Sequence, residues 1–218
     1  SAALVKIENN PYEPELVVPV QAMLEALAPH TGQPLRFIFD NLWLTGGIVA
    51  NQMASDPATS SFVRTTTALT MVNAGVKENV IPQRAEAKVN FRLLPGVTPE
   101  DVIERITAIV DDPNIEISHS RWDKVPGISD HEGVGFQLIE AAVVESYPDA
   151  VVAPTLLMAT TDTRHYIDVT DNQYRFHGNS ASMAQMASIH GTDEYIDIDG
   201  YERSIAVARH LLRHGSRE

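Results

Sequence analysis

The chain has 218 residues, no cysteine and a formal net charge of −13 at pH 7. This length is enough for one large or two small domains with a hydrophobic core. Without cysteine there is no disulfide, thiolate metal site or cysteine nucleophile. The acidic balance argues against nucleic acid and anionic membranes as partners, because phosphate groups need a basic face. A small anionic substrate is compatible with it where arginines gather locally.

The first sixty residues predict helices. Apolar residues share one helical face in residues 14–30, and residues 34–47 indicate a second helix that ends at the pair Gly46 and Gly47. Residues 53–60 predict a loop. No apolar run approaches the roughly 20 residues of a membrane span, so no membrane partner is expected.

Two strands follow, at residues 61–75 and 79–96. In the second, four apolar residues alternate with four polar ones, which is typical of a strand with one buried face; the apolar set is Ala85, Ala87, Val89 and Phe91. The next helix, residues 98–112, begins with Thr98 as its cap and Asp101 in the capping-box position. Residues 114–121 predict a third strand. This order indicates helices packed on one face of a mainly antiparallel sheet.

The character of the sequence changes near Trp122. The second part predicts a helix at 129–147, a short buried strand at 150–157, a turn or short helix at 160–166 and a short strand at 172–176. A last helix runs to about His214, with Asp199 and Glu202 as its capping box. Two short strands are too few for an open sheet, so this part resembles half of a domain.

His190 is a candidate metal ligand because acidic residues follow it closely, in "HGTDEYIDID". A zinc site uses imidazole and carboxylate, and a neighbouring carboxylate can orient the ring. The alternative is a loop histidine ahead of a helix whose N-terminus Asp197 and Asp199 stabilise. Taken alone, the local sequence favours the loop histidine.

Arg92 is a candidate for carboxylate binding, since it lies on the polar face of the second strand and a guanidinium binds carboxylate bidentately. The alternative is an exposed arginine beside Glu86, in a pair worth about 0–1 kcal/mol.

A third candidate is the segment "TTDTRHYID", in which Asp162, His165 and Asp168 become neighbours on a helix. Such a group can form a local metal pair, or Asp162 can simply cap the turn. The other histidines have no ligand spacing and are interpreted as surface or structural residues; they are His30, His119, His131 and His177.

Taken in order, four stretches resemble a known family. They are "RTTTALTMVNAGVKENVIPQRAEAKVNFRLLPG", "TTDTRHY", "YRF" and "IHGTDEYI". They are similar to the zinc exopeptidases and amidohydrolases, the family of aminoacylase, carboxypeptidase S, glutamate carboxypeptidase and succinyl-diaminopimelate desuccinylase. The helical insertion between Pro34 and Ser61 is most similar to the carboxypeptidase S branch.

The resemblance implies an α/β fold in two parts. Residues 1–122 would be a lid and dimerisation domain, a two-layer α/β sandwich with a mainly antiparallel sheet. Residues 123–218 would be the C-terminal part of the α/β zinc-hydrolase catalytic domain. In the family the first half of that domain supplies most ligands of two zinc ions and a Glu general base, so these are expected upstream of Ser1, together with a lid histidine that stabilises the oxyanion.

The resemblance also assigns roles by position. His190 would bind one zinc, while Arg92 and Asn79 would hold the substrate's carboxylate, and Asp162 and Arg164 would shape the pocket. No catalytic residue is expected within these 218 residues. The complete enzyme would hydrolyse peptides or N-acyl amino acids with a water activated by two zinc ions. The segment alone would be inactive, and a homodimer would form through the lid.

Two departures from the family pattern affect the pocket. Ala159 and Thr160 replace glycines, and the residues after the histidine are Asp193, Glu194 and Tyr195 where the family has Asn-Glu-Arg. The second change removes a positive charge and leaves substrate preference open.

Two alternative functions stay open: a non-catalytic dimerisation and binding module, and a complete local metal site of Asp162, His165 and His190. The cytoplasm is the default location, with an upstream signal peptide possible.

Overall fold

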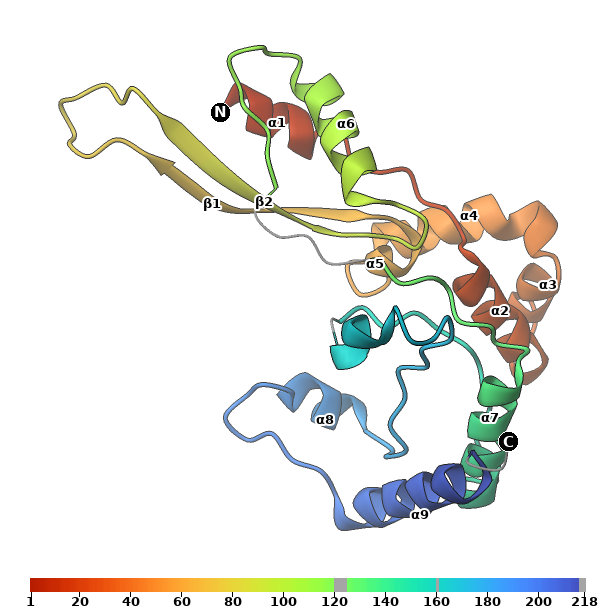
Figure 1. The fold of residues 1–218 in the computed structure, drawn as a ribbon. Coiled ribbons are helices and arrows are strands. Elements are labelled where there is room, and N and C mark those ends of the chain that lie inside the picture. The colour runs from red at the N-terminus through yellow and green to blue at the C-terminus, as the bar shows by residue number, and fades with distance from the viewer. Residues whose placement is uncertain (120–124, 160, 216–218) are drawn as a thin grey trace.

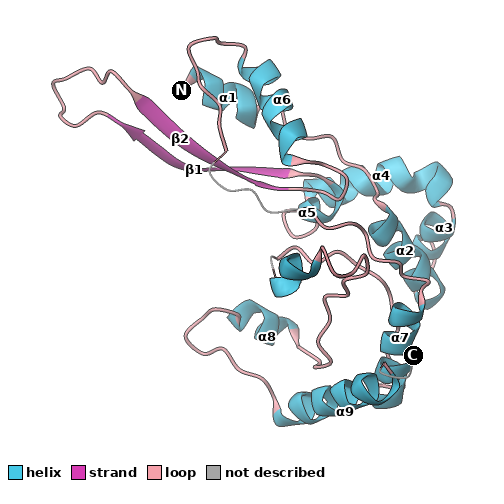
Figure 2. Ribbon diagram, in the orientation of Figure 1, coloured by secondary structure: helices cyan, strands magenta, loops and turns pink. Residues whose placement is uncertain are grey.

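A computed structural model describes residues 1–119, 125–159 and 161–215 (Figure 1). Helices and one two-stranded sheet make up its regular structure (Figure 2). We refer to residues 1–119 as the N-terminal region and to residues 125–215 as the C-terminal region. The predicted domain boundary between residues 122 and 123 and the predicted role of Thr160 lie outside the described residues and stay predictions.

The sheet is an antiparallel ribbon of β1 (Thr66–Ala74) and β2 (Ala85–Arg92). Its ends are fixed by the pairs Thr66–Arg92 and Ala74–Ala85, and the register shifts between Leu69 and Met71. The ribbon projects from the rest of the molecule, and only one end of it is covered by helices (Figure 1). The predicted alternation of apolar and polar residues in β2 therefore produces alternating burial only near the covered end, where Val89 and Phe91 are half-buried.

Helices α1 (Ala2–Glu8) and α6 (Pro99–Val110) pack beside the ribbon. Their core consists of Ile7, Val102, Ile106 and Val110, with Phe91 of β2 packed against it. The predicted capping box is confirmed, because Thr98 accepts a hydrogen bond from the Asp101 backbone and Asp101 accepts one from the Thr98 backbone at 2.7 Å.

The remaining N-terminal elements form a helical cluster. They are α2 (Val18–Leu27), η1 (Ala28–His30), α3 (Leu35–Asp40), α4 (Leu42–Ser55) and α5 (Ser60–Val63). Their buried side chains are Val20, Leu24, Leu42 and Val63, and Leu156 of the C-terminal region packs against them.

The prediction that a helix ends at Gly46 and Gly47 was wrong, because α4 runs through both glycines to Ser55. A Cβ on Gly46 would lie 3.3 Å from Leu16 Cδ1, so α4 approaches its neighbour closely here. The helix therefore continues through both glycines, although each costs about 1 kcal/mol within a helix.

The C-terminal region contains α7 (Val134–Ser146), η2 (Asp162–Tyr166), α8 (Met183–Ser188) and α9 (Ile198–His214). Helices α7 and α9 pack against each other and bury Ala142 and Val207. Between helices the chain is largely extended loop (Figure 2). None of the described helices combines the length and apolarity that a membrane span requires.

Several local predictions for strands and caps were wrong. Within the described residues, segments 114–119, 150–157 and 172–176 have strand-like sequences but form no strand. A strand needs a partner for its backbone hydrogen bonds, and the described chain offers these segments none. The cap of α9 is Asp197, whose Oδ1 accepts from the Gly200 N–H at 2.7 Å, and not the predicted Asp199.

Candidate functional site

An open pocket of about 1010 Å³ lies between the end of β2 and the C-terminal region. Most of its lining is apolar and comes from α7 and from the extended segments that carry Val151–Met158 and Tyr174–Phe176. The basic lining residues are Arg92, Arg164, Arg175, His131 and His190. No Asp or Glu lies in the lining that the described residues form, although the chain has 29 acidic residues. The pocket is thus locally cationic in an acidic chain.

Arg92 enters this pocket from the last residue of β2. One of its terminal nitrogens donates to the backbone oxygen of Met158 at 2.7 Å. This hydrogen bond joins the ribbon to the C-terminal region, while the rest of the guanidinium stays available, because the residue is exposed. An arginine in such a position can bind a carboxylate and also hold the two regions together.

The turn at η2 brings more polar groups to the pocket. Its cap position is Thr161, so the prediction that Asp162 caps the turn was wrong. The hydroxyl groups of Thr161 and Thr163 are 2.7 Å apart, and Arg175 Nε donates to Thr163 Oγ1 at 3.0 Å. Arg164 lines the pocket and its Nε contacts His165 Nε2 at 3.3 Å. Asp162 is exposed and does not belong to the lining.

His190 lies in a tight turn after α8 and lines the same pocket. Its φ of 63° is left-handed, a conformation that costs a residue with a Cβ about 1–2 kcal/mol. The turn is held by two hydrogen bonds, from Gly191 N to Ser188 O at 2.7 Å and from His190 N to Glu194 Oε2 at 3.0 Å. Strained backbone of this kind persists where the surroundings fix it, often at functional sites.

The acidic residues Glu194 and Asp197, near His190, accept hydrogen bonds from backbone N–H groups. Glu194 accepts from the His190 N–H, and Asp197 caps α9 while accepting from Gln185 Nε2 at 2.8 Å. The Gln185 side chain and the Gly200 backbone lower the pKa of Asp197. The caps of α8 and α9 thereby position the turn, and neither carboxylate takes the ring-orienting role.

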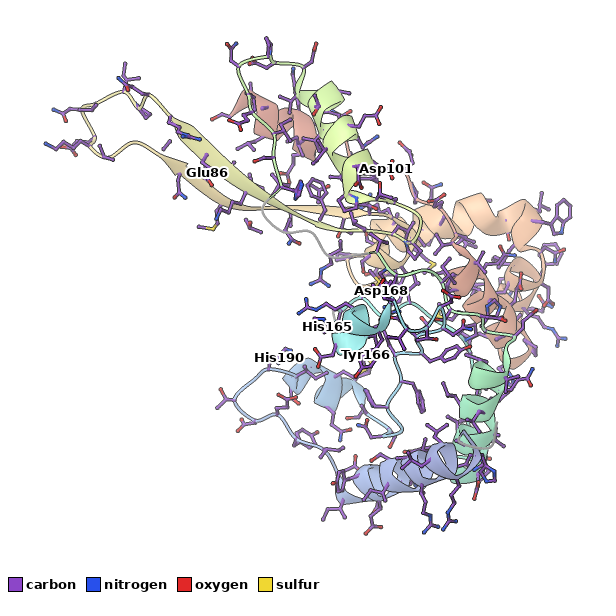
Figure 3. All side chains as sticks on the ribbon, viewed as in Figure 1. Glu86, Asp101, His165, Tyr166, Asp168 and His190 are labelled. Atoms are coloured by element: carbon purple, nitrogen blue, oxygen red, sulfur yellow. The ribbon has the colours of Figure 1, made fainter. Side chains whose placement is uncertain are left out.

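His190 fits zinc as one ligand, since its exposed imidazole faces a pocket and imidazole is a usual zinc donor. No group of three His, Asp or Glu among the described residues lies close enough to hold a metal ion. The hypothesis of a complete local site of Asp162, His165 and His190 was therefore wrong. Figure 3 shows His165 on η2 and His190 after α8, while Glu86 and Asp101 lie on the ribbon and on α6.

Asn79 is not brought to the pocket within one chain. It lies in the turn that joins β1 and β2, at the opposite end of the ribbon from Arg92 (Figure 1). Eight strand residues separate these ends, a length of about 25 Å. Its substrate-binding role stays a prediction, as do the roles of Arg92, Arg164, Asp162 and His190.

Two pocket residues were not found from the sequence. His131 was interpreted as a surface or structural residue, but it lies in the lining. Arg175 received no role, because the short motif "YRF" gives no sign that its arginine meets the η2 turn twelve residues earlier. The place of Arg175 between the aromatic residues Tyr174 and Phe176 was the available signal.

The family model for the peptidase dimerisation domain, M20_dimer, matches residues 10–118. The chain therefore belongs to the M20 family of zinc exopeptidases and amidohydrolases. This confirms the resemblance on which the sequence analysis rests, and the observed α/β architecture agrees with it.

Among curated relatives, the chain is 35% identical to "Probable carboxypeptidase S-like 2" of Dictyostelium discoideum, over 97% of this chain and 41% of the relative. It is 36% identical to "N-fatty-acyl-amino acid synthase/hydrolase PM20D1" of Bos taurus, over 99% of this chain and 44% of the relative. It is 24% identical to "Carboxypeptidase S" of Saccharomyces cerevisiae, over 67% of this chain and 31% of the relative. The chain spans about two fifths of the first two relatives. No solved structure matches it.

Proposed function

We propose that the chain is the C-terminal segment of a zinc-dependent exopeptidase or amidohydrolase. The complete protein would cleave the amide bond of peptides or N-acyl amino acids that have a free carboxylate. The observation that carries this proposal is the pocket that combines His190 with three arginines and, among its described lining, no carboxylate. Such a pocket favours an anionic ligand beside a potential metal ligand.

Each residue has a distinct role in this proposal. Arg92 binds the carboxylate of the substrate from the end of β2, and Arg164 adds positive charge from η2. Asp162 lies at the start of the turn that shapes the pocket. His190 provides one zinc ligand, with the remaining ligands and the general base supplied upstream. Bound zinc would supply Lewis-acid chemistry and a water of lowered pKa.

The matched family model is a dimerisation domain, and we propose a homodimer formed through the ribbon. In the described structure both edges of the two-stranded sheet are unpaired, and an open edge is a template for pairing with another chain. Apolar side chains stand exposed on the ribbon and its turn; they include Met71, Val72, Val80 and Ile81. A substrate contact by Asn79 would then require the pocket of a second copy.

The test uses the full-length protein with an N-acyl amino acid as substrate, with and without a chelator. We expect chelation to abolish hydrolysis and zinc to restore it. Arg92→Gln should raise KM for the carboxylate substrate by about 10- to 100-fold, as expected for loss of a charge-assisted hydrogen bond. Arg209→Gln is the matched control, because Arg209 is exposed on α9 and lies outside the pocket lining.

Hydrolysis that survives chelation would contradict the proposal, as would an unchanged KM in Arg92→Gln. If the full-length protein binds itself but hydrolyses no amide, the alternative of a non-catalytic dimerisation module is favoured. The 218-residue segment alone should show no turnover, because only His190 among its described residues fits the metal site.

A further inference from the structure

The structure assigns Arg175 as a second carboxylate-binding residue of the pocket, one that determines specificity alongside Arg92. This inference rests on the proposed function, whose substrate has a free carboxylate. It adds a binding residue on the catalytic side of the pocket, whereas Arg92 reaches it from the dimerisation domain.

The pocket gathers positive charge. Three arginines from separate segments, Arg92, Arg164 and Arg175, line one pocket, and the described lining includes no Asp or Glu. The chain as a whole has 16 basic and 29 acidic residues, so a random lining would be mainly acidic. Guanidinium groups that gather in a concave, largely apolar pocket create a positive potential that attracts an anion. The concentration of guanidinium groups is thus explained by an anionic ligand.

A hydrogen bond to the η2 turn orients the side chain of Arg175. Its Nε donates to Thr163 Oγ1 at 3.0 Å, and the Thr163 hydroxyl also contacts Thr161. This contact fixes the orientation of the guanidinium plane. Among the described residues, its two terminal nitrogens have no hydrogen-bond partner, although the side chain is half-buried in the pocket lining.

A half-buried guanidinium without an acidic partner pays part of its desolvation cost without compensation. Two parallel N–H groups match the two oxygens of a carboxylate, which is why arginine binds this group well. The terminal nitrogens of Arg175 are oriented by Thr163 and open to the pocket. They are therefore suited to bind the anionic end of the substrate.

Arg92 divides its hydrogen bonds between two partners, because one of its terminal nitrogens donates to the backbone oxygen of Met158 at 2.7 Å and only the rest of the guanidinium is left for a carboxylate. A second guanidinium would complete the hydrogen bonding of the carboxylate and neutralise its charge. Arg175 is part of the C-terminal region, so its contact with the substrate would not depend on the position of the ribbon.

The experiment compares two substrates in the full-length protein: an N-acyl amino acid and its carboxamide analogue. Arg175→Gln should raise KM for the carboxylate substrate by about 10- to 100-fold and change kcat by less than about threefold. The KM for the carboxamide should change by less than about threefold, because it presents no negative charge. Arg175→Lys should restore part of the carboxylate affinity, and Arg209→Gln should change the KM of neither substrate.

The outcomes separate this inference from the proposed function. If unsubstituted protein shows chelator-sensitive hydrolysis and Arg175→Gln affects both substrates equally, Arg175 only braces the η2 turn and the inference is overturned alone. The same holds if Arg175→Gln leaves the preference for carboxylate over carboxamide unchanged. If the unsubstituted protein hydrolyses neither substrate, the proposed function fails and this inference fails with it.

Discussion

The N-terminal and C-terminal regions of this chain are held together by different means. In the N-terminal region two strands satisfy each other's backbone groups, and α1 and α6 bury a compact set of aliphatic side chains beside them. In the C-terminal region α7 and α9 pack together, but the extended segments between helices form no ladder within the described residues. This difference indicates that a segment with alternating apolar and polar residues forms a strand only where a partner strand is present.

Individual hydrogen bonds hold the extended segments in place of a ladder. Tyr147 donates its hydroxyl hydrogen to Gly178 O at 2.9 Å, and Gln173 N donates to Ser129 Oγ at 2.7 Å. Each links a segment to a neighbouring helix or loop, and each depends on one side chain. We therefore expect this region to unfold locally at lower free energy than the N-terminal core.

The largest effect on stability is expected in the N-terminal core. Ile106→Ala should lower the free energy of unfolding by about 2–5 kcal/mol, because it leaves a cavity among Ile7, Val102 and Val110. Chemical denaturation followed by circular dichroism measures this change. Val169→Ala is the control, since Val169 is 78% exposed and should change stability by less than about 0.5 kcal/mol. A loss of equal size in the control would show that the effect of Ile106→Ala does not come from the N-terminal core.

A pair of glycines tests the packing of the C-terminal region. A Cβ at Gly178 would lie 2.6 Å from Val207 Cβ, so Gly178→Ala should cost about 1–3 kcal/mol. Gly47→Ala, with nothing within 4 Å of the new Cβ, should stabilise α4 by about 0.5–1 kcal/mol. Thermal unfolding of both variants measures the contrast. Equal shifts of the two would mean that the segment around Gly178 does not pack on α9.

A smaller effect is expected at the cap of α6. Thr98→Ala removes the acceptor for the Asp101 N–H and should cost about 1 kcal/mol. Thr98→Ser keeps the hydroxyl and should retain most of the stability. Equal stability of Thr98→Ala and the unsubstituted protein would contradict the observed capping box.

The smallest effect is a pH dependence from the same cap. Hydrogen bonds from Thr98 lower the pKa of Asp101 below its ordinary value. A carboxylate whose folded pKa is depressed stabilises the fold above its unfolded pKa of about 3.9 and loses this effect as pH falls through the folded pKa. The stability difference between the unsubstituted protein and Asp101→Asn should therefore shrink in acid. A difference that grows below pH 4 would contradict the assignment.

Sequence patterns predicted elements best where the causes are local. The capping box of Thr98 and Asp101 is readable because all of its hydrogen bonds lie within four residues. The continuation of α4 through Gly46 could not be predicted, because it depends on contact with Leu16, thirty residues away. The strand-like segments at 150–157 and 172–176 failed for the same reason, since their conformation depends on partners and not on their own alternation.

The pocket residues likewise fall into those that sequence motifs identified and those that only the fold brings together. Arg92, Arg164 and His190 were recognised through motifs and lie together in its lining. Arg175 and His131 were missed, because only the folded chain brings their segments to the same pocket. Asn79 belongs to a recognised motif, yet the ribbon carries it away from Arg92. Motif position thus identified three residues that share one pocket, and their roles toward a substrate stay predictions.

The most direct test of the account is the zinc content of the full-length protein, measured together with hydrolysis of an N-acyl amino acid. We predict that His190→Ala loses bound zinc and nearly all turnover. His177→Ala, an exposed histidine outside the pocket lining, should keep both. Full zinc content and unchanged turnover in His190→Ala would contradict the account.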